Sequence, residues 1–168
     1  GNDGMIIHMH GNGQDQIGQI HKSGELIVHG DVGQCYGYGS KGGKLFVLGN
    51  AAGRPMINSV GSPKLVINGT ALDYLAESFM AGDPLDGGGF VIVNGMQFDE
   101  RGELISLETP YPGGNLFSLA SGGAIYIRDP RQRLSDSQLN GGAFTDMTDA
   151  DWEVVQPILY RNQEHFGI

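Results

Sequence analysis

Short apolar runs bounded mostly by glycine recur along the chain, and this repeat constrains the fold more than any other feature. The residues that close the runs lie at positions 11, 30, 49, 69, 95 and 129, so successive runs are 19, 19, 20, 26 and 34 residues apart. Each run holds five or six residues rich in Val, Ile, Leu and Phe, which is typical of a strand and too short for a helix. The spacing therefore predicts one strand in each unit of about 20 residues, with insertions in the two longest units.

A single unit of this kind cannot bury its own apolar face, but a stack of units can. A coil of three short sides at ~3.3 Å per residue uses about this many residues, and glycine supplies the left-handed conformation that tight corners require. We therefore predict an all-β fold, a right-handed parallel β-helix built as a single-stranded solenoid. The turn glycines expected at its corners are Gly30, Gly43, Gly49, Gly69, Gly89, Gly95 and Gly123.

Alternation within the runs assigns side chains to two faces. One face is entirely aliphatic and is predicted to line the interior; its first column is Leu26, Leu45, Leu65, Val91 and Ile125. The opposite face is also apolar, more so than is usual for a surface exposed to water. The C-terminal helix, a second copy of the chain or a catalytic partner could cover it, but one helix would shield only part of five stacked units, so we expect self-association or a partner surface. This candidate interface consists of Ile27, Phe46, Val66, Ile92 and Tyr126.

The domain organisation follows from the same spacing. Residues 1–145 are predicted to form the β-helix domain, with insertions at 82–88 and at 96–112, the latter a projecting hairpin or loop. Residues 146–168 change character and predict a capping helix over an open end of the stack. Thr148 and Asp151 have the spacing of a helix N-cap and a first-turn carboxylate.

Composition excludes several classes of function. The net charge is −9 and the isoelectric point is about 4.8, which disfavours binding to nucleic acid or to anionic lipid. No apolar run approaches the ~18 residues that a membrane span requires. The single cysteine, Cys35, excludes an internal disulfide and fits a reducing compartment. We expect a cytoplasmic protein that binds neither nucleic acid nor membrane.

Motifs for catalysis are weak. The stretch Gly37–Gly42 matches G-x-G-x-x-G, but a strand follows it rather than the helix that a dinucleotide site requires, so we interpret it as a glycine corner. Cys35 has no partner at a metal-ligand spacing, which favours an inert thiol. The sequence predicts no catalytic residue and no cofactor in this chain.

Histidines gather near the start of the chain, and three of them are weak candidates for a metal site. His10 and His29 occupy the same position of the repeat, and His8 lies on the same face as His10. Such imidazoles can ligate zinc or nickel. Later members of this column are Leu48, Asn68, Asn94 and Arg128, which favours an ordinary outward polar column. We expect His10 and His29 to lie side by side without binding a metal tightly.

Three stretches resemble a known family: Tyr38–Phe46, Gly49–Arg54 and Ser121–Asp129. They resemble the C-terminal GXGXG β-helix domain of the large subunit of glutamate synthase, and they are similar to the C subunit of formylmethanofuran dehydrogenase. In that family the domain packs against catalytic domains, while the glutaminase cysteine, the flavin barrel and the iron–sulfur ligands lie elsewhere.

The resemblance implies a non-catalytic scaffold of a glutamate-synthase-like oxidoreductase, with protein partners, a second copy of the chain, or both. Two alternatives remain open from the sequence. One is the scaffold subunit of a formylmethanofuran-dehydrogenase-like one-carbon complex. The other is a stand-alone metal-dependent hydrolase that uses His8, His10 and His29.

Overall fold

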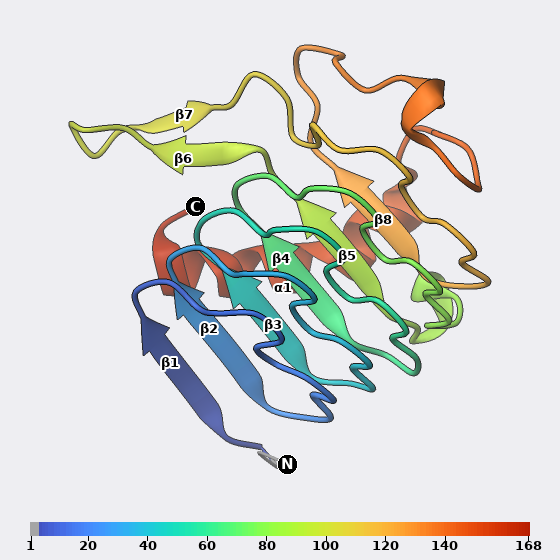
Figure 1. Cartoon of the computed structure of the whole chain (residues 1–168), viewed down its shortest axis with the longest axis horizontal. Helices are drawn as coiled ribbons and strands as arrows, with labels where there is room; N and C mark the ends of the chain where they lie inside the picture. Colours follow the sequence, from blue (N-terminus) through green and yellow to red (C-terminus); the bar gives the residue numbers. More distant parts are fainter. Residues whose placement is uncertain (1–3) are drawn as a thin grey trace.

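One parallel sheet organises residues 4–168, the part of the chain that the computed structural model describes (Figure 1). Its strands lie in the order β1-β2-β3-β4-β5-β8 and pair in parallel. Leu26, Leu45 and Leu65 are direct neighbours across β2, β3 and β4, so the repeat correctly predicted the strands and their register. The strands are β1 (Ile6–His10), β2 (Glu25–His29), β3 (Lys44–Val47), β4 (Lys64–Ile67), β5 (Phe90–Val93) and β8 (Ala124–Ile127).

The remaining elements interrupt or follow this sheet. A short 3₁₀ turn, η1 (Pro84–Asp86), lies within the predicted insertion at 82–88. The insertion at 96–112 holds an antiparallel hairpin of β6 (Met96–Phe98) and β7 (Leu104–Ser106), which projects from the body of the molecule (Figure 1). A second 3₁₀ turn, η2 (Asp136–Gln138), precedes the C-terminal helix α1 (Asp149–Phe166).

The start of α1 is fixed by a capping box. The backbone N–H of Asp151 donates to Thr148 Oγ1 at 3.2 Å, and the backbone N–H of Thr148 donates to Asp151 Oδ2 at 2.8 Å. These bonds satisfy amide groups that the helix itself leaves without a partner. The helix then continues through Pro157 to Phe166. The N-cap predicted from the sequence is confirmed.

The connections between the strands turn through left-handed residues at every second position. Cys35, Gly37 and Gly39 have φ values of 58°, 71° and 64°. The N–H groups of Cys35 and Gly39 donate to the next connection at 3.0 and 2.8 Å, while that of Gly37 donates to the preceding one at 2.9 Å. A left-handed non-glycine residue costs roughly 1–2 kcal/mol, which these hydrogen bonds help to offset. The pattern recurs at Arg54, Met56 and Asn58, at Tyr74, Ala76 and Ser78, and at Asn115, Phe117 and Leu119.

The predicted all-β, right-handed parallel β-helix is wrong. In the described residues the connections pair only through isolated bridges, such as Val32 with Ala51 and Val60 with Met80, and they form no further parallel sheet. The alternating left-handed residues explain this, because they bend the chain too often for extended walls to form. The architecture is mixed α/β: a six-stranded parallel sheet, a two-stranded antiparallel sheet and a C-terminal helix.

The predicted corner glycines serve two different purposes. Gly43, Gly95 and Gly123 have φ values of 75°, 62° and 82°, the left-handed conformation expected of them. Gly30, by contrast, is required by space, because an added Cβ would lie 2.5 Å from the carbonyl oxygen of Gly11. The same close approach of a neighbouring turn explains Gly49, Gly69 and Gly89.

Both faces of the sheet are buried over its central strands, β2 to β5. The predicted interior column packs with aromatic and aliphatic side chains of the connections, and Leu45, Leu65 and Val91 in it have no exposed surface. Ile125, in the last strand, is only partly buried. The outer column is packed against Val155 and Ile158 of α1.

The predicted interface column is therefore corrected: the chain's own helix covers it, rather than a second copy or a partner. Phe46 has no exposed surface, Ile92 is 4% exposed, and Tyr126 is partly buried. Figure 1 shows α1 running across the back of the sheet, not over an open end as expected.

Candidate functional site

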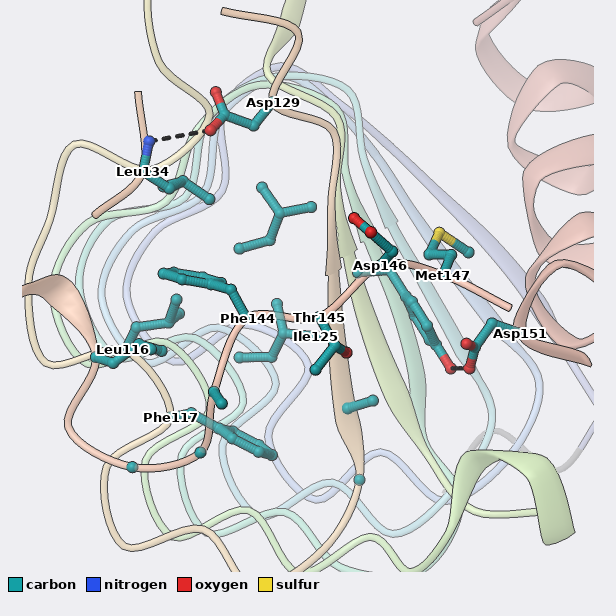
Figure 2. A pocket seen from close by; sticks show the side chains of 18 of the residues that line it. Leu116, Phe117, Ile125, Asp129, Leu134, Phe144, Thr145, Asp146, Met147 and Asp151 are labelled. Carbon is teal, nitrogen blue, oxygen red and sulfur yellow. Dashed lines mark hydrogen bonds between the residues drawn. The ribbon is translucent and has the colours of Figure 1, made fainter. Parts of the chain in front are cut away.

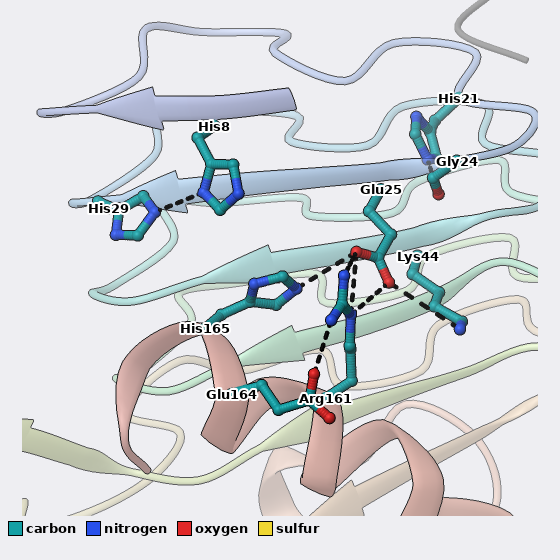
Figure 3. A network of polar contacts seen from close by, with 9 residues as sticks. All are labelled: His8, His21, Gly24, Glu25, His29, Lys44, Arg161, Glu164 and His165. Carbon is teal, nitrogen blue, oxygen red and sulfur yellow. Dashed lines mark hydrogen bonds and ion pairs between the residues drawn. The ribbon is translucent and has the colours of Figure 1, made fainter. Parts of the chain in front are cut away.

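Chemically active side chains meet where β1 and β2 face the last turns of α1 (Figure 3). The pairing of β1 with β2 sets His8 beside Ile27 and His10 beside His29 on the outer face of the sheet. The helix adds Arg161 and His165 from the far end of the chain. The cluster therefore combines two neighbouring units of the repeat with an element outside the repeat.

Three imidazoles lie in contact at the free edge of the sheet. His8 Nδ1 is 2.9 Å from His29 Nε2, so one ring donates a proton that the other accepts. The rings of His10 and His29 are stacked with centroids 4.3 Å apart. Burial and the neighbouring His10 and His8 lower the pKa of His29 below its ordinary value. The prediction that His10 and His29 lie side by side is confirmed.

The Glu25 carboxylate anchors α1 to the sheet. Arg161 grips it with two nitrogens: Nε lies 2.9 Å from Oε1, and a terminal nitrogen lies 2.7 Å from Oε2. Lys44 Nζ is 4.0 Å away, a weaker contact. The Arg161 guanidinium holds the pKa of Glu25 below its usual value, against the opposing effect of burial. A charge this buried is stable only because it is paired.

His165 sits behind this ion pair. Its Nε2 is 3.3 Å from Glu25 Oε2, close enough for an ion pair but without the alignment of a hydrogen bond. Its ring also meets Phe46 and His8 edge-on, with centroids 4.8 and 5.6 Å apart. Burial and the positive charge of Arg161 lower the pKa of His165, and Glu25 only partly counteracts them. The ring is therefore held in its neutral form near neutral pH.

The imidazoles of the cluster interact with one another. Among residues 4–168, no three or more His, Cys, Asp or Glu side chains are arranged to hold a metal ion. The candidate ligands His8, His10 and His29 come together as a stack and a hydrogen-bonded pair, not as a converging ligand set. This arrangement does not support the metal-dependent hydrolase.

The other sequence motifs do not form sites. The stretch Gly37–Gly42 lies between β2 and β3 and leads into a strand. The N–H groups of Gly37 and Gly39 already donate to backbone carbonyl oxygens, so they do not cradle a phosphate. Cys35 is partly buried at a left-handed position of the same connection.

A hollow opens beside β8, at the end of the sheet opposite to the imidazole cluster (Figure 2). Its volume is about 620 Å³, and Leu116, Phe117, Ile125 and Phe144 supply apolar surface. Asp129 at its border accepts the backbone N–H of Leu134 at 3.0 Å. Asp151 accepts the Tyr126 hydroxyl at 3.0 Å and also caps α1. These two carboxylates stabilise the surrounding loops, so the hollow offers apolar surface rather than an acid–base pair.

Sequence reasoning missed the polar contacts that hold α1. Asn162 is fully buried and exchanges two amide hydrogen bonds with Asn68, at 2.9 and 2.8 Å, while Asn94 donates to Asn68 at 2.9 Å. Glu25 was overlooked as well. The available signal was its charge, since the equivalent residues of the next two units are Lys44 and Lys64.

The described part of the chain has no helix that combines the length and the apolarity needed to span a membrane. No curated protein and no solved structure matches the chain. The family model described as the GXGXG motif matches residues 1–156. This match covers the sheet, its stacked connections and half of α1. The chain belongs to the GXGXG motif family.

Proposed function

We propose that this chain is a non-catalytic interaction domain of a glutamate-synthase-like oxidoreductase, which packs against catalytic domains or subunits and carries no cofactor of its own. The observation that carries the proposal is the family match over residues 1–156. The stretches Tyr38–Phe46 and Ser121–Asp129, which resemble the glutamate synthase domain, lie within the matched region.

The use of polar residues in the fold supports this role. Two polar pairs join the helix to the sheet. Glu25 forms an ion pair with Arg161, and Asn68 forms a hydrogen bond with Asn162. The buried hydroxyl of Tyr111 likewise donates to the carbonyl oxygen of Gly114 at 2.7 Å. Polar groups engaged in this way make the body rigid, which is what a scaffold requires.

We place the partner on the hairpin of β6 and β7. Phe98, Leu104 and Ile105 remain 41%, 36% and 39% exposed there. Ion pairs hold the segment after β7 to the body, because Glu108 contacts Arg131 and Arg133 at 2.6 Å. The directly paired Phe98 and Leu104 share one face of this hairpin, which exposes the kind of apolar surface that a catalytic domain buries.

Purification of the native complex tests the proposal. The chain is tagged in its source cells and recovered at low salt, and the co-purifying chains are identified by mass spectrometry. We expect catalytic chains of a glutamate-synthase type, with flavin and iron–sulfur absorbance in the complex and not in the isolated chain. Recovery of a one-carbon complex would overturn the glutamate synthase assignment. Turnover of glutamine, an ester or formamide by the isolated chain would overturn the non-catalytic role.

A further inference from the structure

We propose that the imidazole cluster of His8, His10, His29 and His165 is an acid-sensitive latch, which releases β1 from the sheet when the cluster takes up protons. The cluster joins the first strand of the sheet to the second strand and to α1 (Figure 3). The inference concerns a conformational property of the domain and does not depend on the proposed partner.

The arrangement seen in the structure, the closed state, is incompatible with protonation of both ring nitrogens on every imidazole of the cluster. The 2.9 Å contact between His8 Nδ1 and His29 Nε2 requires one of these nitrogens to be unprotonated. His10 stacks on His29 at 4.3 Å, so a charge on either ring faces the other directly. Imidazolium groups at such distances repel each other, and the repulsion is relieved when the rings separate.

The charged groups around the cluster do not compensate for added positive charge. Glu25 on β2 is a carboxylate that contacts the cluster, through His165, but Arg161 of α1 already neutralises it at 2.7 Å, and Lys44 on β3 adds a second cation at 4.0 Å. Glu164 of α1 is engaged by Arg161 at 2.7 Å. His165 is the imidazole closest to Glu25, at 3.3 Å. With these carboxylates already engaged, added positive charge in the cluster is uncompensated, and the pKa of His29 is lowered in the closed state.

β1 is the strand that separation would release. It has one neighbour in the sheet, whereas β2 to β5 have two. Ile6 and Ile7 on this strand are 55% and 37% exposed, so β1 buries little apolar surface. Opening it would expose Leu26, the inward neighbour of Ile7 in the register, at the end of the core.

The direction of the pH effect follows from proton linkage. Burial and the neighbouring His10 and His8 lower the pKa of His29 below 6.5, and release of β1 removes both neighbours, so the open state binds more protons than the closed state. The closed state is therefore most strongly favoured above pH 6.5, and the equilibrium shifts towards the open state as the pH falls through the lowered pKa. Each additional proton bound on opening changes the equilibrium by about tenfold per pH unit.

Hydrogen exchange of the full chain at about pH 7.5 and about pH 5, corrected for the intrinsic exchange rate, measures the latch. We expect protection of the β1–β2 ladder to fall by about tenfold or more, while that of the β3–β4 ladder changes by less than about twofold. Binding of an apolar dye should rise over the same range. Unchanged protection of β1, or an equal loss in β3 and β4, would overturn the proposal.

Substitutions separate the latch from general acid sensitivity. His8→Gln and His29→Gln each remove one imidazole from the bonded pair, and we expect either change to reduce the loss of β1 protection to about twofold or less. His21→Gln is the matched control, because His21 hydrogen-bonds to Gly24 outside the cluster and should leave the loss intact. Since His8 is exposed, its variant should fold. Retention of the full acid-induced loss in His8→Gln would overturn the mechanism.

Discussion

The two faces of the sheet are both buried over the central strands β2 to β5, but by different means. The inner face is covered by the connections of the repeat, and the same contacts recur from one unit to the next. The outer face is covered by α1, which is not part of the repeat and meets a different side chain on each strand. A repeated sequence therefore predicts the burial that the repeat itself provides, and it gives no information on what a separate element covers.

The way in which each face is held also differs. The inner face depends on continuous apolar packing and on hydrogen bonds between successive connections. The outer face combines apolar packing against Val155 and Ile158 with a few polar pairs that are distant in sequence, such as Glu25 with Arg161 and Asn68 with Asn162. A charge buried in the inner face should therefore unfold the molecule, while loss of a single polar pair on the outer face should have a graded effect.

The largest effect is expected from Leu65→Asp on the inner face. Leu65 has no exposed surface and lies between Leu45 and Val91, so the variant would bury an unpaired carboxylate at a cost of several kcal/mol. We expect loss of the cooperative thermal transition measured by circular dichroism. Leu85→Asp, at a position that is 50% exposed, is the control and should melt like the native chain. A cooperatively melting Leu65→Asp protein would contradict the assignment of this face to the core.

A smaller effect is expected from Asn162→Ala beneath the helix. The change removes the reciprocal amide bonds to Asn68 and leaves a small void, which together should cost about 1–3 kcal/mol. Denaturant unfolding followed by circular dichroism measures this difference. Gln163→Ala, at the next and exposed position of α1, should change stability by less than about 0.5 kcal/mol. Equal stabilities of the two variants would show that the amide pair does not hold the helix.

The contrast between the faces explains which features the sequence predicts. Alternation within regularly spaced runs predicts the strands, their register and the inner column, because these depend on local pattern. The same spacing predicts that His10 lies beside His29. The left-handed conformations of Arg54 and Tyr74 have no comparable signal, because neither is a residue type that favours them. Because these bends leave no signal in the sequence, we predicted a closed β-helix, which the chain bends too often to form.

The covering of the outer face was not predictable in detail, because the contacts join distant segments. Glu25 and Arg161 are 136 positions apart, and Asn68 and Asn162 are 94 apart. The apolar outer column indicated that something covers it, and its pattern did not distinguish a partner from the chain's own helix. His165 joined the imidazole cluster in the same unpredicted way.

Glu25→Gln should weaken the outer face by about 1–2 kcal/mol. This value lies below the usual cost of breaking a buried ion pair, because the Arg161 side chain is 30% exposed and can be hydrated. The pKa of Glu25 is lowered from 4.5, so its contribution is present above that pH and is lost as the pH falls below it. Urea unfolding from about pH 7 to about pH 3 should therefore show a shallower loss of stability in Glu25→Gln than in the native chain. Glu164→Gln, whose side chain is 63% exposed, is the control and should keep the native slope.

The smallest effect on stability is expected outside both faces, on the hairpin. Phe98 and Leu104 are 41% and 36% exposed and pair directly across the hairpin, so Phe98→Lys and Leu104→Lys should each change stability by less than about 0.5 kcal/mol. If the hairpin contacts a catalytic domain, either lysine should reduce co-purification of the native complex by about tenfold, because a charge would enter an apolar contact. Leu119→Lys is the matched control, since Leu119 is 76% exposed on a connection of the stack. Equal recovery with Phe98→Lys and with Leu119→Lys would move the partner away from the hairpin and leave the two faces of the sheet unaffected.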